Sequence, residues 1–525
     1  RSTLFPYTTL FRSTNFTQEK IRNVAIVAHV DHGKTTLVDG LLKSSGIFRD
    51  NQVVQDRVMD SNTIERERGI TILSKNTALE YKGYKINVID TPGHADFGGE
   101  VERVLKMANG VVLVVDAFEG PMPQTKFVLR KAFDLKLPVV VCVNKIDRPD
   151  ARPQEVVDEV LELFLQMDVG DQYFNSPFIF ASAKEGYATT DWKNVKDDMQ
   201  DIFDAIIAHI PAPSGDENAP FQLLISTTDY SEYVGRIGIG KIERGVIQLG
   251  QDAVMVNYNN PDLNKKIKIT NMFEFDGLSR VPVEKSSVGN IVAVTGVERI
   301  NIGDTLCDSS SIEALPFLKI SEPTMAMTFS VNDSPFAGKD GEYVTSRQVR
   351  ARLFRELQTD VSLRVEETDS TDAFRVSGRG ELHLSVLIEN MRREGYEFQV
   401  SKPEVLYKKD ENGKFVEPME QVTIDVDQEF VGNVMEKLGQ RKGELIDMHP
   451  SSSGTMRLLF SIPARGLIGY RQEFLTDTKG NGIMNALFDG YAPYKGDIPK
   501  RCLGSLICSE SGESSAYGLH SAQSS

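Results

Sequence analysis

The sequence is poor in the residues that stabilise small secreted proteins and in the long apolar runs that cross membranes. Its 525 residues include only 4 cysteines and 1 tryptophan. Scattered cysteines do not form a disulfide framework, which favours a reducing compartment. No apolar run reaches the roughly 18 residues that a membrane-spanning helix needs. Because a secretory signal is also not recognisable, we expect a cytoplasmic protein with no membrane partner.

An excess of positive charge is missing as well. The chain has 59 Lys and Arg against 75 Asp and Glu, a formal net charge of −16. Such an acidic chain does not coat nucleic acid without selectivity, so any contact with RNA must be local. Hydrophobic residues make up 40% and charged residues 26%, which is a globular balance and excludes disorder of the whole chain. The length predicts several domains.

The first domain, which we place at 15–212, alternates apolar runs with helical patterns. The apolar runs are typical of strands that are buried on both faces of a mostly parallel sheet. We therefore predict an α/β domain with strands at 24–30, 85–90, 111–117 and 139–145, and with helices that begin at Lys34 and cover 96–108 and 122–136.

The remainder predicts smaller β-rich modules. Short strands punctuated by glycine at 218–312 indicate a β-barrel. Residues 320–402 and 415–495 each show the order strand, helix, strand, strand, helix, strand, which is a ferredoxin-like unit. The fold class is thus multidomain, α/β and β. We interpret 1–14, which begin without Met, as a foreign, disordered leader, and 496–525 as the truncated start of a C-terminal domain with a β-like beginning.

The segment AHVDHGKT follows the first strand and opens a helix, as a phosphate-binding loop does. Ala28 stands where the pattern has glycine, but Gly33, Lys34 and Thr35 match it. Backbone N–H groups and the helix N-terminus bind phosphate oxygens, Lys34 adds a charge for the β- and γ-phosphates, and Thr35 offers a hydroxyl to Mg²⁺. The alternative is an ordinary strand–turn–helix.

Two further segments bear chemistry for a terminal phosphate. DTPGH follows the next strand, with Asp90 suited to a Mg²⁺ shell, the Gly93 amide to a γ-phosphate and His94 to an attacking water. RERGITI lies between the two loops, and its Thr71 is a candidate for Mg²⁺ and γ-phosphate contact. Taken alone, His94 is more simply interpreted as a histidine in a loop, and RERGITI as a charged surface segment.

Two strand ends suit recognition of a base. In NKID, the Asp147 carboxylate can accept from the N1–H and the amine of guanine, which adenine does not offer as a pair. We expect Asn144 to tie this loop to the phosphate loop and the Lys145 stem to lie over the base. SAK, which comprises Ser182, Ala183 and Lys184, follows another strand and can offer an N–H to guanine O6. Each motif is weak alone, but their order favours GTP binding.

With these motifs in order, the chain resembles the translational GTPases. RGELHLSVLIENMRREGYEFQV is similar to a ferredoxin-like domain of elongation factor G. DHGKTTLVDGLL and PARGLIGYRQEFLTDTKGNGIMNALFDGYAPYKGDI resemble the BipA/TypA subfamily, and the likeness covers residues 15 to about 510. The short segment 401–418 leaves no space for the domain that elongation factor G inserts there. LepA also lacks that domain, but its expected string is DHGKST, whereas this chain has DHGKTT.

The resemblance implies a ribosome-stimulated GTPase that assists large-subunit assembly and translation under stress. It implies a monomer whose partners are GTP and GDP, the large-subunit rRNA at the factor-binding site and, as a further candidate, tRNA. By resemblance, Thr35, Thr71 and Asp90 look like the Mg²⁺ shell, and Asp31 looks like a residue that helps to hold a monovalent cation such as K⁺. His94 looks like the catalytic histidine, assisted by Lys34 and Thr71. The rest of the expected GTP-binding set is His32, Gly33, Thr36, Gly93, Asn144, Lys145, Asp147, Ser182, Ala183 and Lys184.

Some alternatives stay open at this point. One is a GTP-gated RNA or ribosome scaffold in which hydrolysis is incidental, and another is a LepA-like factor. A non-ribosomal GTPase and a truncated product without a role are further alternatives, although the paired ferredoxin-like modules argue against the former. The family's expected A-[FY]-x-L-W-N-L-Q pattern is not matched near His520, which puts productive ribosome binding in doubt. Basic residues of the second ferredoxin-like module can face RNA or be ordinary solvated charges, and they are Arg441, Lys442, Arg457, Arg465 and Arg471.

Overall fold

The computed structural model describes most of the chain. The described residues are 16–29, 31–45, 75–91, 98–167, 169–231, 234–297, 300–317, 322–358, 360, 362–410, 412–450, 455–480, 482–498 and 512–524. They form two compact units, one made of 1–408 with 484–489 and the other of 409–483 with 490–525. Among the described helices, none has the length and apolar character that crossing a bilayer requires.

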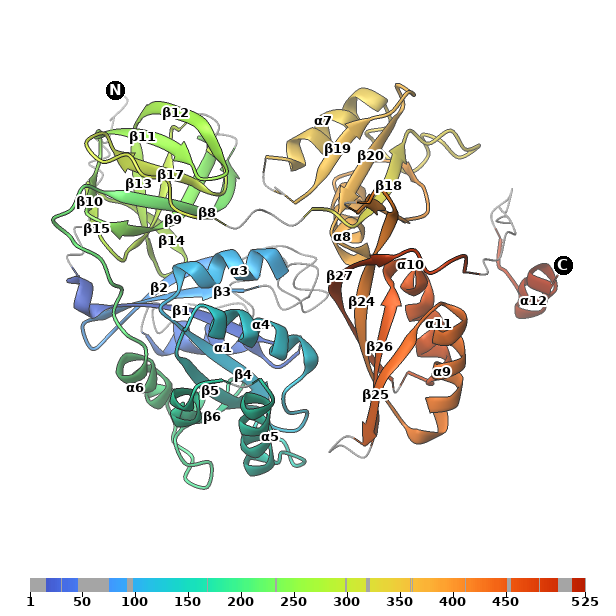
Figure 1. Cartoon of the computed structure of the whole chain (residues 1–525), viewed down its shortest axis with the longest axis horizontal. Coiled ribbons are helices and arrows are strands. Elements are labelled where there is room, and N and C mark those ends of the chain that lie inside the picture. The colour runs from blue at the N-terminus through green and yellow to red at the C-terminus, as the bar shows by residue number, and fades with distance from the viewer. Residues whose placement is uncertain are drawn as a thin grey trace, which may run out of the picture. The chain divides into compact units, whose positions relative to one another are not determined.

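A twisted sheet forms the centre of the first domain (Figure 1). Its strand order is β2-β3-β1-β4-β5-β6-β7. The inner strands run parallel, whereas β2 and β7 pair antiparallel at the edges. The strands are β1 (Ile21–Ala28), β2 (Lys75–Tyr81), β3 (Tyr84–Asp90), β4 (Gly110–Asp116), β5 (Val139–Asn144), β6 (Phe178–Ser182) and β7 (Tyr187–Thr189).

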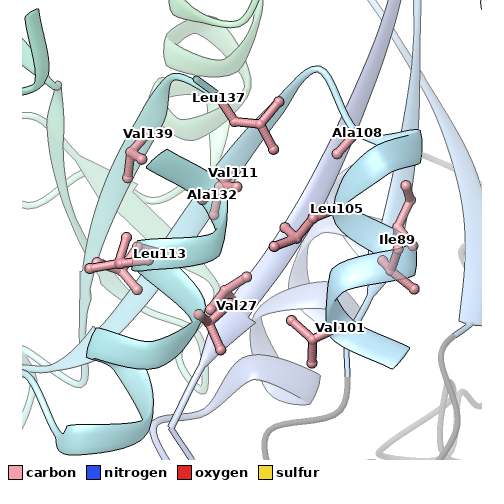
Figure 2. Packing of buried hydrophobic residues seen from close by; sticks show 14 of the residues in the cluster. Val27, Ile89, Val101, Leu105, Ala108, Val111, Leu113, Ala132, Leu137 and Val139 are labelled. Carbon is pink, nitrogen blue, oxygen red and sulfur yellow. The ribbon is translucent and has the colours of Figure 1, made fainter. Parts of the chain in front are cut away.

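Helices cover both faces of this sheet, which is why its strands are continuous apolar runs. Helices α1 (Lys34–Ser44) and α6 (Gln200–His209) pack on one face. The other face lies under α3 (Gly98–Met107), α4 (Pro123–Asp134) and α5 (Pro153–Gln166). Figure 2 shows part of this second core, where Val101 and Leu105 of α3 lie over Val27 of β1 and Ile89 of β3. Cys142 lies in the sheet as plain core, and its burial raises the pKa of the thiol to about 12.

The next domain is a curved antiparallel sheet, as the glycine-punctuated pattern predicts. Its order is β12-β11-β17-β8-β9-β16-β13-β14, with a separate pair of β10 and β15. Its apolar residues, including Leu223, Ile242 and Val294, enclose one core. The strands are β8 (Gln222–Ser231), β9 (Gly235–Arg244), β10 (Val246–Gln248), β11 (Asp252–Asn257), β12 (Asn260–Lys268), β13 (Asn271–Asp276), β14 (Ser279–Pro282), β15 (Lys285–Ser287), β16 (Ile291–Thr295) and β17 (Asp304–Asp308).

A buried polar joint fastens this barrel to the sheet of the first domain. Lys85 of β3 donates to Glu274 of β13 at 2.5 Å and to Asn290 at 3.1 Å. Ser286 donates to the second oxygen of Glu274 at 2.6 Å, and Asn23 of β1 donates to the Gly289 carbonyl at 2.8 Å. The five side chains of this joint are almost fully buried, so their polar groups depend on partners within the protein for hydrogen bonds.

The first ferredoxin-like module follows the predicted order closely. It contains β18 (Met325–Ser330), α7 (Ser346–Glu356), β19 (Arg364–Glu367), β20 (Ala373–Gly378), α8 (Glu381–Arg393), β21 (Gln399–Val400) and β22 (Glu404–Val405). The sheet order is β19-β20-β18-β21, and β22 also pairs with β18. Helix α7 begins where it does because Thr345 and Gln348 form a capping box.

The second module contains β23 (Lys408–Lys409), β24 (Phe415–Val426), α9 (Val431–Gln440), β25 (Glu444–Pro450), β26 (Met456–Pro463), α10 (Ala464–Leu467), α11 (Tyr470–Asp477) and β27 (Ile483–Pro493). Its sheet order is β23-β24-β26-β25, and β27 pairs with β24. Where the predicted order has one second helix, the structure has two, because α10 ends at Leu467 and α11 begins at Tyr470. Gly469, which directly precedes α11, has a φ of +74°, a left-handed conformation that favours glycine.

Three arginines of this module are held by acidic partners rather than being freely solvated. Arg465 is 7% exposed and forms a buried pair with Glu417. Arg457 donates to both oxygens of Asp425, and Arg441 donates to Glu473 at 2.9 Å. The interpretation as ordinary solvated charges is therefore wrong for Arg465, because a buried guanidinium needs a partner. Beyond residue 511 the chain forms a helix, α12 (Ala516–Ser524), whereas most of the segment for which a β-like beginning is predicted lies outside the described residues.

Candidate functional site

The phosphate-loop segment leaves β1 and turns directly into α1. Asp31 and Gly33 both have positive φ, +67° and +88°, and the helix begins at Lys34 as predicted. A Cβ at Gly33 would collide with the side-chain amide of Asn144, so glycine is required by both space and conformation. Thr35 and Thr36 lie half-buried in the first helical turn, where backbone N–H groups remain available to an anion.

Lys34 reaches across to the end of the neighbouring strand. Its ammonium lies 2.6 Å from Oδ1 of Asp90 and donates to the Thr91 carbonyl. Asp90 is fully buried and Lys34 is 8% exposed. The structure thus brings together the lysine and the carboxylate that the sequence assigns to phosphate and Mg²⁺, at the carboxyl ends of two parallel strands where α/β sheets bind ligands.

Asn144 links three loops that lie far apart in the sequence. Its Nδ2 donates to the His32 carbonyl at 2.9 Å, and its Oδ1 accepts from the Ala183 amide at 3.0 Å. The side chain is 1% exposed. The predicted tie between the NKID segment and the phosphate loop is therefore confirmed, and it extends to the SAK segment.

The base-reading candidates lie beside this tie. Asp147 and Lys184 are exposed, whereas Ser182 is buried and accepts from the Glu185 amide at 3.3 Å. Burial raises the pKa of Tyr187, and the negative charge of Asp147 adds to this effect, which places Asp147 near the start of β7. An exposed carboxylate beside a tied loop is free to accept hydrogen bonds from a ligand.

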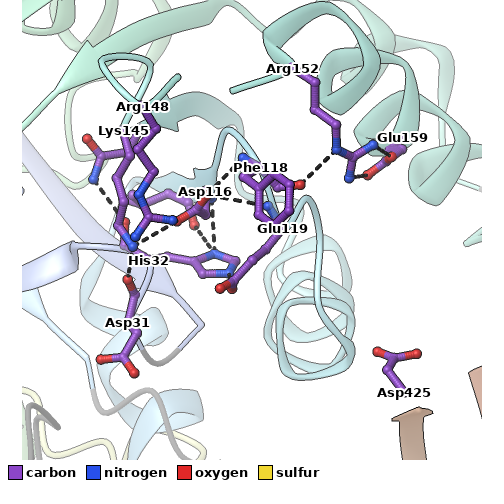
Figure 3. Close-up of polar contacts among 12 residues, drawn as sticks. Asp31, His32, Asp116, Phe118, Glu119, Lys145, Arg148, Arg152, Glu159 and Asp425 are labelled. Atoms are coloured by element: carbon purple, nitrogen blue, oxygen red, sulfur yellow. Dashed lines mark hydrogen bonds and ion pairs between the residues drawn. The ribbon is translucent and has the colours of Figure 1, made fainter. Parts of the chain in front are cut away.

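Lys145 belongs to the NKID segment, which we call the base-reading segment, and it bridges this segment to the phosphate loop (Figure 3). Its ammonium donates to the Asp31 carbonyl at 2.6 Å and lies 2.7 Å from Asp116. Lys145 itself has a φ of +64°, so this contact holds two left-handed residues in place. Burial pushes the pKa of Asp116 upward, but hydrogen bonds from Lys145 and the Phe118 amide outweigh burial and leave the pKa below its ordinary value.

Asp116 and Glu119 are residues that the motifs did not indicate. Asp116 is the last residue of β4 and Glu119 lies in the turn that follows. His32 contacts each of them: its Nδ1 accepts from the Asp116 amide at 3.3 Å, and its Nε2 lies 3.2 Å from Glu119. The contact with His32 lowers the pKa of Glu119. An acidic residue at the carboxyl end of a buried strand at the same sheet edge is the signal that could have identified Asp116.

Three predicted residues, Thr71, Gly93 and His94, lie outside the described residues. For Mg²⁺, the Thr35 hydroxyl and the Asp90 carboxylate fit, because both are hard oxygen donors on adjoining loops. In the described part of the chain, no cluster of three or more His, Cys, Asp or Glu side chains is placed to hold a metal.

Family models of translation factors match three parts of the chain. The elongation factor Tu GTP binding domain matches residues 19–212, elongation factor Tu domain 2 matches 235–307 and the elongation factor G C-terminus matches 414–502. With the site geometry, these matches define a translational GTPase, an enzyme that hydrolyses GTP. The large ribosomal subunit assembly factor BipA of Bacillus subtilis (strain 168) is 54% identical over 500 residues, which is 95% of this chain and 81% of that protein. The chain belongs to the BipA family.

Other relatives agree with this membership. BipA of Synechocystis sp. is 53% identical over 503 residues, covering 96% of this chain and 84% of that protein. BipA of Escherichia coli (strain K12) is 51% identical over 507 residues, covering 96% and 83%. A crystal structure of a protein from Thermus thermophilus shares the fold with a TM-score of 0.62 at 16% identity, covering 91% of this chain and 98% of that chain.

Proposed function

We propose that the chain hydrolyses GTP in response to the ribosome and thereby assists assembly of the large ribosomal subunit. The observation that carries the proposal is the Asn144 tie, which joins the phosphate loop, the NKID segment and the SAK segment. These three segments contribute to one edge of the sheet although they are more than a hundred residues apart at the extremes. A binding site for a nucleotide, with a phosphate end and a base end, accounts for all three.

The phosphate end is built for charge. Lys34 and the N-terminal turn of α1 stabilise the negative charge of the β- and γ-phosphates, and catalysis is largely positioning and electrostatics. When bound, Mg²⁺ neutralises developing charge, and Thr35, Thr71 and Asp90 are the residues that would hold it. Asp31 is exposed beside the loop and is the candidate for a monovalent cation. His94 orients the attacking water.

The base end selects guanine. Asp147 accepts from the paired donors of the base, and the Lys145 stem lies along its face. Since the Ala183 amide already donates to Asn144, the adjoining Lys184 amide is the candidate donor to guanine O6. In this account the protein acts as a cytoplasmic monomer, and contacts with rRNA and tRNA come from its other modules.

Substitution of the proposed catalytic histidine tests the function. We expect His94→Ala to bind GTP and GDP with unchanged affinity, because His94 orients water rather than holding nucleotide. Ribosome-stimulated hydrolysis should fall by roughly a hundredfold or more, the usual contribution of a positioned general base or orienting group. Phosphate release is measured with and without purified ribosomes. Unchanged stimulated turnover would show that His94 lacks this role.

A further inference from the structure

The segment made of the last residue of β4 and the turn after it contacts both loops of the proposed nucleotide site without belonging to either of them. This segment, 116–120, places Asp116 against Lys145 and His32, and Glu119 against His32 (Figure 3). We propose that Asp116 and Glu119 are positioning residues that hold the phosphate loop and the base-reading segment at a fixed separation, and so set nucleotide affinity. The inference rests on the proposed nucleotide site and adds residues that act through His32 and Lys145.

His32 is the first connection. Its side chain is fully buried in the phosphate loop, directly before Gly33. The Asp116 amide donates to Nδ1 at 3.3 Å, which leaves the ring proton on Nε2, facing Oε2 of Glu119 at 3.2 Å. Nδ1 also lies 3.4 Å from the Val114 carbonyl. The tautomer with its proton on Nδ1 would satisfy that carbonyl, but it would set the Nδ1–H against the Asp116 N–H and an Nε2 lone pair against the Glu119 carboxylate.

Lys145 is the second connection. The Asp116 carboxylate is fully buried and also accepts from the Phe118 amide at 2.8 Å, so its orientation is fixed. It holds the Lys145 ammonium, which in turn donates to the Asp31 carbonyl. Both Asp31 and Lys145 are non-glycine residues with positive φ, a conformation that persists only where neighbours enforce it.

The segment itself is anchored from its far side. Arg152 donates to the Phe118 carbonyl at 2.7 Å and pairs with Glu159 of α5. Gly120 has a φ of +74°, and a Cβ there would collide with the Glu159 carboxylate. Helix α5 therefore holds the segment rigidly, and a rigid segment can position the two loops that it contacts.

The experiment compares four proteins by calorimetric titration with GDP in magnesium buffer: the wild type, Glu119→Ala, Glu119→Gln and Glu155→Ala. Glu119→Ala leaves a buried ring N–H without an acceptor, and we expect GDP to bind about tenfold more weakly. Glu119→Gln retains an acceptor oxygen and should bind within about threefold of the wild type. Glu155→Ala is the matched control, because Glu155 contacts the same Arg152 from α5 but is 70% exposed, and it should bind like the wild type.

A positioning role predicts further results that general destabilisation does not. In a His32→Asn background, Glu119→Ala should have no additional effect on GDP affinity, because Glu119 acts through the imidazole. The ¹⁵N shifts of His32 should show a protonated Nε2 and an unprotonated Nδ1. Unchanged affinity in Glu119→Ala, an undiminished effect in the His32→Asn background, or the opposite tautomer would overturn the inference.

The two proposals fail in different ways. A wild-type protein that binds neither GDP nor GTP would overturn the nucleotide site, and with it the effect on affinity. The His32 spectrum is recorded without nucleotide, so the opposite tautomer would overturn the Glu119 contact even when GDP binds normally.

Discussion

Replacing Asn144 by alanine tests whether one buried side chain holds the nucleotide site together. The change removes two hydrogen bonds, to the His32 carbonyl at 2.9 Å and from the Ala183 amide at 3.0 Å. It also leaves both backbone groups without their partner in a region that is almost closed to water. Loss of two such bonds costs about 2–4 kcal/mol in the free energy of unfolding of the nucleotide-bound protein.

The assay must measure the whole loss of free energy, because part of it lowers the stability of the free protein and part weakens GDP binding. Urea unfolding at a saturating concentration of a fluorescent GDP analogue, followed by the release of that analogue, measures both together. A loss confined to affinity would weaken GDP binding by roughly 30-fold to several hundredfold. Asn194→Ala is the control, because Asn194 is exposed in the same domain and its side chain donates to the exposed Asp191 at 2.6 Å.

Asn144→Ala and Asn194→Ala should differ in the urea concentration at which they unfold. Asn144→Ala should unfold at distinctly lower urea than the wild type, and Asn194→Ala should change the free energy of unfolding by less than about 0.5 kcal/mol. If the two variants unfold together, the Asn144 bonds do not hold the three loops, and the structural basis for the site is refuted.

Two further predictions concern the joint and the first ferredoxin-like module. Glu274→Leu alone should lower the free energy of unfolding by about 3–5 kcal/mol, because it leaves the Lys85 ammonium buried without its carboxylate. The double variant Lys85→Met with Glu274→Leu should recover most of that loss. Chemical denaturation of both variants checks this prediction, and equal losses would contradict it. Glu397 should titrate at about pH 2 rather than 4.5, because it accepts from the Gly338 and Gly341 amides and from Asn332. Since the folded pKa is the lower one, the contribution of Glu397 to stability is present above about pH 4.5 and disappears as the pH falls toward 2. Carboxyl ¹³C shifts against pH measure this, and a midpoint near 4.5 would contradict it.

The sequence predicts the regular elements well because strong local patterns determine them. The helix at Lys34 and the strand at 139–144 lie within one residue of the expectation, since continuous apolar runs and helix starts are local signals. The break between α10 and α11 was missed because Gly469 is one of several glycines in that segment, and a positive φ there is decided by tertiary packing.

The site is predictable only where chemistry follows a recognisable motif. Asn144 and Lys34 are found from motif and strand position alone. Asp116 and Glu119 are not, because their importance lies in contacts with His32 and Lys145, which are distant in the sequence. Likewise, the burial of Arg465 depends on Glu417, 48 residues earlier, and periodicity does not reveal such a partner.

Base selectivity is the most direct test of the whole account. Calorimetry with GDP, ADP and xanthosine diphosphate in magnesium buffer should give binding heat with GDP alone for the wild-type protein. Asp147→Asn should move the preference to the xanthine nucleotide, because the carboxylate that accepts from guanine is replaced by an amide that can donate. No heat with GDP, or equal affinity for GDP and ADP, would contradict a site that reads guanine at the end of β5.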